Sequence, residues 1–241
     1  MAKVTVTPTE FHFVTYDADV ITKLVAEVAD LVGIPAGAEI AINIDESTPL
    51  GRCVVTSLDP IVIEIEGGAF ENAKAPRQLS ERSVRDVCAR LLFKISDRLS
   101  GRFDNAPAEG EVPLTHTVAW DVYAVGRSAR AGVEVSKPRR LYHFRNRHGF
   151  TDVADAAFET LWTADGLSWE EIDALVSDVA AAKTPAYLVG GSPTRSRVRL
   201  PAWTGSFSNL YRQLLASPVC RPPGPPSSTA PALVCRRGAL G

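Results

Sequence analysis

The densest group of residues that could do chemistry lies between Ser136 and Asp152, in the segment SKPRRLYHFRNRHGFTD. It contains four arginines, one lysine and two of the chain's four histidines. An arginine side chain can bind two oxygens of a phosphate or carboxylate at once, and a histidine can hold or transfer a proton near neutral pH. The composition of this segment therefore predicts a site for an anionic group.

A strand over residues 140–147 would bring the best candidates together. With a period of two, His143, Arg145 and Arg147 would share one face of that strand, and His148 would follow at its end. A helix beginning near Thr151 would add free N–H groups that attract anions. We therefore predict ligand binding by His143, Arg145, Arg147 and His148. The alternative is that these arginines pair with the chain's own acidic residues.

The leading functional hypothesis is a binding or regulatory module without catalysis, for an anionic small molecule or an acidic protein partner. It rests on the lack of a complete set of nucleophile, base and orienting group in the sequence. One alternative is a hydrolase or transferase acting on a phosphorylated or carboxylate substrate, with His143 or His148 as the acid–base group. Another is an RNA or single-stranded DNA contact through residues 136–150. Whether the protein is an enzyme stays open at this point.

The common nucleotide-binding and hydrolase motifs are absent from the sequence: there is no P-loop, no Gly-x-Gly-x-x-Gly, no Gly-x-Ser-x-Gly and no His-Glu-x-x-His. His148 and Asp152 have the spacing of two helical metal ligands, but Gly149 between them argues against a continuous helix. We predict neither a metal site nor a cofactor. The acidic residues Glu64 and Glu66 are interpreted as part of a solvated sheet face.

Charge is distributed unevenly along the chain. Residues 1–191 carry 19 Lys and Arg against 28 Asp and Glu, a net charge of −9, whereas residues 192–241 carry seven arginines and no acidic residue. A body at −9 repels phosphate-rich polymers on average. Nucleic acid is therefore an unlikely partner in this interpretation, and any contact with a polyanion must be local. Between Arg127 and Arg147, seven basic residues and one acid make such a local positive region.

The sequence also bears on the compartment. The four cysteines are far apart and form no Cys-x-x-Cys pair, so neither a disulfide framework nor a zinc ribbon is indicated. The first residues alternate polar and apolar types, unlike a signal peptide, and no apolar run approaches the roughly 20 residues that span a bilayer. We expect a cytoplasmic protein without a membrane segment.

The pattern of elements predicts an α+β fold with a mixed or antiparallel sheet packed by about four helices. An edge strand at residues 3–14, interrupted at Pro8, precedes a helix capped by Asp17. Three β-like runs at 38–44, 52–58 and 61–66 lead to a second helix that begins at Ser80 or Ser83 and places Cys88 on its buried face.

Beyond residue 100 we expect a loop at 100–114, a second β region with strands at 115–125 and 140–144, and two helices. The first of these helices is capped at Thr151 or Asp152, and the second begins with the capping box Ser168–Glu171. Residues 1–191 would form one globular domain, with two possible halves joined near 100–114. Residues 192–241 hold eight of the chain's 17 prolines and are expected to form a basic, disordered-like tail.

Overall fold

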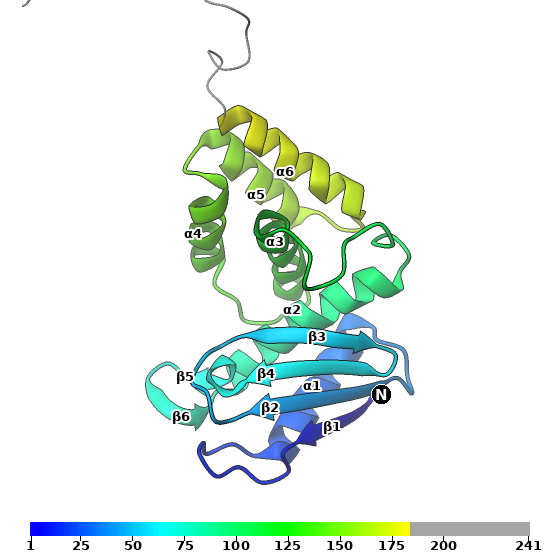
Figure 1. Cartoon of the computed structure of the whole chain (residues 1–241), viewed down its shortest axis with the longest axis vertical. Coiled ribbons are helices and arrows are strands. Elements are labelled where there is room, and N and C mark those ends of the chain that lie inside the picture. The colour runs from blue at the N-terminus through cyan, green and yellow to red at the C-terminus, as the bar shows by residue number, and fades with distance from the viewer. Residues whose placement is uncertain (184–241) are drawn as a thin grey trace, which may run out of the picture. The chain divides into compact units, whose positions relative to one another are not determined.

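The computed structural model describes residues 1–183, and the predicted tail at 192–241 lies outside the described residues. The described part is α+β, as predicted (Figure 1). It contains six α-helices, a four-stranded mixed sheet and a small two-stranded sheet. The elements are β1 (Lys3–Thr7), α1 (Ala18–Val32), β2 (Glu39–Asp45), β3 (Cys53–Leu58), β4 (Ile61–Glu66), β5 (Glu71–Asn72), β6 (Ala75–Leu79), α2 (Glu81–Leu99), α3 (Leu114–Arg130), α4 (Lys137–His148), α5 (Asp152–Thr163) and α6 (Trp169–Lys183).

The four-stranded sheet has the order β1-β2-β4-β3. β2 pairs in parallel with β1 and with β4, whereas β3 runs antiparallel to β4 as the first arm of a hairpin. β1 and β3 are therefore the two edge strands, which confirms the predicted edge position of the first strand, although that strand ends at Thr7 and does not continue to residue 14. The pairing of β3 with β4 slips by one residue at Thr56, between Val55 and Ser57, which is a β-bulge.

One face of the sheet forms the first hydrophobic core. Alternate residues of the two central strands are at most 6% exposed, namely Ile40, Ile42, Ile44, Ile61, Ile63 and Ile65. They pack with the apolar faces of α1 and α2, including Cys88, which is fully buried as predicted. Both helix starts are also as predicted, because Asp17 and Ser80 accept backbone N–H groups in the first turn of their helices.

The acidic residues near the ends of β2 and β4 are each bound locally. Glu64 accepts a hydrogen bond from the Asn43 amide at 2.8 Å, and Glu66 accepts one from the backbone N–H of Arg52 at 2.9 Å. Glu46 accepts the backbone N–H groups of His12 and Phe13 and so fixes the loop after β1. These carboxylates therefore support loops and strand pairs rather than forming a common site.

The second hydrophobic core lies among α3, α5 and α6, with one residue each from α4 and the loop after α2. Its large buried side chains are Phe103, Trp120, Tyr123, Phe144, Phe158 and Trp169. The capping box before α6 is confirmed, since Ser168 N–H donates to Glu171 and Glu171 N–H donates to Ser168 Oγ. α2 contacts α1 and β3 as well as α3, so it connects the two cores (Figure 1).

The predicted second β region is wrong. Residues 115–125 belong to helix α3 and residues 140–144 to helix α4. The loop at 100–114 therefore leads from α2 to α3 and does not join two halves of a sheet. Of the helices in residues 1–183, none combines the length and the apolar character that crossing a membrane would require.

Candidate functional site

The helical structure of α4 separates the residues that were predicted to bind a ligand together. Positions two apart on a helix point in nearly opposite directions, so His143, Arg145 and Arg147 do not share a face as they would on a strand. The premise of the predicted site is therefore wrong, and each residue has its own surroundings.

Arg145 is held by an internal partner. Its Nε and Nη2 donate to the two carboxylate oxygens of Asp155, at 2.8 and 2.6 Å. This paired hydrogen bond from Arg145 also lowers the pKa of the Asp155 carboxyl below its ordinary value. For Arg145, the interpretation that the arginines pair with the chain's own acids is the one the geometry supports.

His148 is also part of the interior. It is 2% exposed, its ring stacks on Phe144 with centroids 4.0 Å apart, and its Nε2 lies 3.1 Å from the carbonyl oxygen of Thr115. Burial lowers the pKa of His148, so the neutral ring is favoured. A neutral, buried ring packed in this way holds α4 against the start of α3.

His143 and Arg147 differ from these two because both are exposed on the surface of α4. Within residues 1–183 neither side chain has an ion pair or hydrogen bond, although the His143 ring lies 6.3 Å from the ring of Tyr142. The four predicted ligand-binding residues thus divide into two that are structural and two that are accessible.

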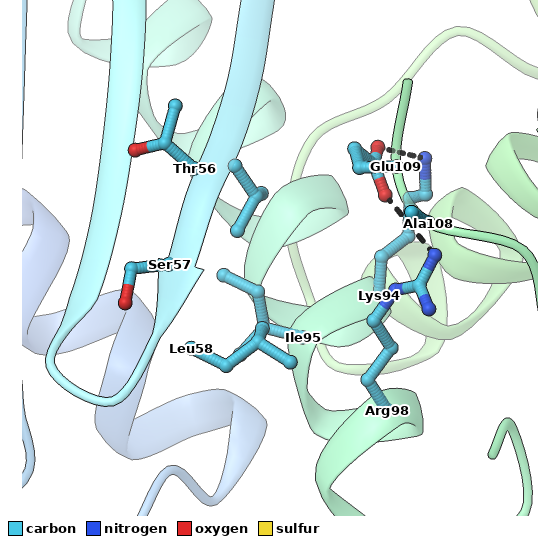
Figure 2. Close-up of a pocket in the computed structure, with 9 residues that line it drawn as sticks. Thr56, Ser57, Leu58, Lys94, Ile95, Arg98, Ala108 and Glu109 are labelled. Atoms are coloured by element: carbon cyan, nitrogen blue, oxygen red, sulfur yellow. Dashed lines mark hydrogen bonds and ion pairs between the residues drawn. The ribbon is translucent and has the colours of Figure 1, made fainter. Parts of the chain in front are cut away.

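A cavity of about 330 Å³ lies elsewhere, between β3, α2 and the loop after α2. Its lining is Val55, Thr56, Ser57, Leu58, Lys94, Ile95, Arg98, Ala108 and Glu109. Figure 2 shows Thr56 and Ser57 of β3 on one side, Lys94, Arg98 and Glu109 on the other, and Leu58 and Ile95 between them. We call this feature the β3–α2 groove. It has an apolar base and one charged wall.

Two cations and one carboxylate form the charged wall. Lys94 Nζ lies 3.2 Å from a Glu109 oxygen, and Arg98 Nη2 lies 3.6 Å from the other. Arg98 also donates to the carbonyl oxygen of Pro107 at 2.7 Å. The same two cations lie over the ring of Trp120, at 4.6 and 5.1 Å from its centroid, which fixes their position. The wall is therefore preorganised, and two cations and one carboxylate of its residues line the groove.

Behind this wall, buried and half-buried charged residues of α2 pair with an acid of α3. Arg90 Nη1 lies 3.3 Å from both oxygens of Asp121, and Lys94 Nζ lies 3.7 Å from one of them. Burial opposes ionisation of Asp121, but Arg90 and Lys94 outweigh it and lower the pKa below its ordinary value. Asp121 consequently stays charged and holds Lys94 at the groove.

The opposite wall is the free edge of β3. Glu66 N–H donates to the carbonyl oxygen of Arg52, and in an antiparallel pair such hydrogen-bonded positions alternate with positions whose backbone groups point outward. The register places Cys53 and Val55 at the outward positions. No other strand of the described sheet pairs with this edge. Val55 therefore offers an N–H and a C=O along the groove.

Sequence reasoning missed this groove. Lys94 and Arg98 lie on the polar side of a helix, a position that is typical of solvated side chains, and Glu109 lies in a loop without periodicity. Nothing local in the sequence brings a loop and an edge strand together. For α4, a signal existed: Pro138 in its first turn is a recognised feature of helix starts.

Comparison with known proteins finds no matching family model, no curated protein of significant similarity and no solved structure that matches the chain. The described residues also hold no group of three or more His, Cys, Asp or Glu that could bind a metal ion. The functional argument therefore depends on the geometry of the groove and of α4.

Proposed function

We propose that this protein is a binding module that takes up an extended, acidic segment of a partner protein in the β3–α2 groove. The observation that carries the proposal is the free edge of β3 lying beside a cavity with an apolar base and two fixed cations. An extended peptide that joins a sheet edge gains affinity from main-chain hydrogen bonds and specificity from pockets for alternate side chains.

The composition of β3 supports a peptide as the occupant. Exposed edge strands are commonly protected by charged residues or proline, yet Cys53–Leu58 reads CVVTSL, which contains neither. The groove follows four consecutive residues of the strand, from Val55 to Leu58, which is about 13 Å of extended chain. The bulge at Thr56 twists this edge, which favours a short segment over open-ended sheet growth.

Charge favours an acidic segment. Lys94 and Arg98 share one carboxylate at the groove, Glu109, and Lys94 is only 6% exposed at its side chain. A carboxylate on the bound segment would meet two cations that are partly shielded from water, so its attraction to them is stronger than at an open surface. Of the two partners predicted from the sequence, an anionic small molecule and an acidic protein, the groove therefore favours the acidic protein.

The test begins with a random dodecapeptide library displayed on phage and selected on the full-length protein. Enriched peptides are then synthesised, and their dissociation constants are measured by fluorescence anisotropy. We expect enrichment of sequences with at least one Asp or Glu beside β-branched or aromatic residues. Amide exchange of residues 53–58 should slow when such a peptide is bound.

Two pairs of variants locate the binding site. Val55→Pro removes the outward backbone N–H but no hydrogen bond to β4. Val55→Thr keeps that N–H and has a side chain of similar shape. Arg98→Gln removes one cation of the groove, and Arg102→Gln removes an exposed cation outside its lining. We expect at least about tenfold weaker binding, or about 1.4 kcal/mol, for the first member of each pair only.

Thermal melts establish that all four variants are folded. Equal affinity of Val55→Pro and Val55→Thr for the selected peptides would contradict binding at the edge, as would a library that yields no enrichment. Dimerisation of the wild type through β3, detected by sedimentation and abolished by Val55→Pro, would show that a second copy of this chain is the occupant and would also overturn the proposal.

A further inference from the structure

The exposed side of α4 carries an unusual combination of side chains. Positions three and four apart on this helix form one stripe, and every member of the stripe is exposed: Arg139, Tyr142, His143, Asn146 and Arg147. Phe150, which is 65% exposed, lies directly after the helix with its ring 6.4 Å from that of Tyr142. We call these six residues the α4 surface.

The ion pairs of α4 show why this surface is positive. The helix has five basic residues and no acid. Three of them pair with acids of other elements: Lys137 with Glu159, Arg140 with Asp86, and Arg145 with Asp155. Arg139 and Arg147 have no such partner among residues 1–183. The chain's acidic excess is therefore not used to neutralise the exposed stripe.

Exposed aromatic rings make the surface more than a positive patch. Tyr142 is 59% exposed and contacts Phe150 edge to face, with 68° between the two ring planes. Other phenylalanines of this part of the chain, such as Phe144 and Phe158, are fully buried and fill a core instead. Two neighbouring exposed rings beside unpaired arginines form a contiguous patch of the kind that marks an interaction site.

We propose that the α4 surface binds single-stranded nucleic acid. Arginine forks match phosphate oxygens, and an exposed ring accepts a base on its face, which is how sequence-tolerant single-strand binding works. The Asn146 amide lies between the two arginines in the stripe and has both a donor and an acceptor for base edges. Phosphate, base face and base edge thus each have a matching group.

The chain's overall charge favours a single strand over a membrane. A flexible strand can contact the α4 surface alone, whereas an anionic bilayer is a broad surface that would also face the acidic remainder of residues 1–191. An acidic peptide would use the arginines but has no bases for the two rings. The surface is separate from the β3–α2 groove, so this inference does not depend on the proposed function.

The experiment measures binding of a fluorescein-labelled, mixed-sequence RNA dodecamer to the full-length protein by anisotropy, at several salt concentrations. Residues 192–241 carry seven arginines and are kept in every variant, so their contribution is common to all. Tyr142→Ala/Phe150→Ala removes both rings, and Arg139→Gln/Arg147→Gln removes both cations. Arg52→Gln/Lys74→Gln removes two exposed cations from another part of the protein and serves as the matched control.

We expect the ring variant to bind the dodecamer about tenfold or more weakly, because each stacked base contributes to affinity. We expect the arginine variant to lower the slope of log K against log salt by about 1.4, since each neutralised phosphate of a single strand contributes about 0.7. The control should change neither quantity. Circular dichroism and thermal melts confirm that the variants are folded.

Three results would overturn the inference. The first is equal dodecamer affinity of the ring variant and the wild type. The second is the same salt slope for the arginine variant and the Arg52→Gln/Lys74→Gln control. The third is a preference for another anion. This would be a higher affinity for vesicles of phosphatidylserine and phosphatidylcholine than for the RNA, or a higher affinity for poly-glutamate, measured by competition at equal charge.

Discussion

A buried ion pair between α2 and α3 allows the sharpest prediction about stability. Asp97 is 1% exposed, and one of its oxygens accepts hydrogen bonds from Trp120 Nε1 at 2.7 Å and from Arg127 Nη2 at 2.6 Å. The Arg127 guanidinium also lies over the rings of Tyr123 and Phe93, at 4.0 and 4.8 Å. Asp97 Oδ1 and Arg127 Nε are buried without partners in the described structure.

Arg127→Met should lower the free energy of unfolding by about 3 to 5 kcal/mol at pH 7, because it leaves the buried Asp97 carboxylate with Trp120 as its main hydrogen-bond donor. Asp97→Asn should cost less, since the two rings still favour the Arg127 cation while the oxygen of the new amide still accepts from Trp120. The double variant Asp97→Asn/Arg127→Met contains no buried charge at this position. It should be more stable than Arg127→Met alone.

The pH dependence adds a second readout. Burial raises the pKa of Asp97 above its ordinary value, although Arg127 and Trp120 lower it in part. A carboxyl whose folded pKa is raised favours protonation in the folded state, so its contribution to stability decreases as pH rises through the interval between the unfolded and folded values. Removing Arg127 raises the folded pKa further. The loss of stability caused by Arg127→Met should therefore become smaller as the pH is lowered from about 7 toward about 4, whereas the loss of stability caused by Asp97→Asn should not.

Urea unfolding of the full-length variants, followed by tryptophan fluorescence, measures all of these quantities. With a slope of about 2 kcal/mol per molar urea, a loss of about 4 kcal/mol moves the midpoint by about 2 M. A loss below about 1 kcal/mol for Arg127→Met would refute the reasoning, because it would mean that the carboxylate is already hydrated. Strict additivity of the two single losses in the double variant would refute it as well.

Two further predictions concern packing. Leu91 is 2% exposed on the buried face of α2, so Leu91→Ala should lower the free energy of unfolding by about 2 to 5 kcal/mol. Leu99, on the same helix, is 50% exposed, so Leu99→Ala should lower it by less than about 0.5 kcal/mol. Similar midpoints of urea unfolding for the two variants would show that the helix is placed with the wrong face inward. Gly126→Ala should destabilise the protein despite alanine's higher helix propensity, because its Cβ would clash with the carbonyl oxygen of Trp162 and force α3 and α5 apart. Gly110→Ala, where a Cβ meets nothing within 4 Å, is the control, and an unchanged melting temperature for Gly126→Ala would contradict the close helix contact.

The elements of residues 1–99 could largely be predicted from the sequence, because their helix caps and strand patterns are local signals that agree with one another. Asp17 and Gly33 mark the ends of α1, and each cap has the expected geometry. The strand pattern Ile61, Ile63, Ile65 alternates because one face of the sheet packs on helices while the other stays open. The parallel pairing of β2 with β4 was beyond the sequence, since β3 intervenes between them in the chain.

The mistake at α3 has a physical cause. THTVAWDVYAV is rich in β-branched and aromatic residues, and these favour strands only when a pleated surface is available to pack against. Within it, Ala119, Trp120 and every residue from Val122 to Val125 are buried, so burial does not alternate as it does along a half-buried strand. Packing against α5 and α6 decides the structure here, and the local preference does not.

The same limitation hid the candidate groove, for a reason that involves both cores. The apolar residues of α2, such as Leu91 and Leu92, belong to the core of the sheet, so its charged residues would ordinarily be assigned to solvent. Instead, Lys94 and Asp97 are buried against α3, where Asp121 and Arg127 provide opposite charges. A helix can have two buried sides only if its polar side meets matching charges from elsewhere in the chain. Because such matching is a property of pairs distant in sequence, a cation like Lys94 becomes a candidate for ligand recognition only once the elements are placed in space.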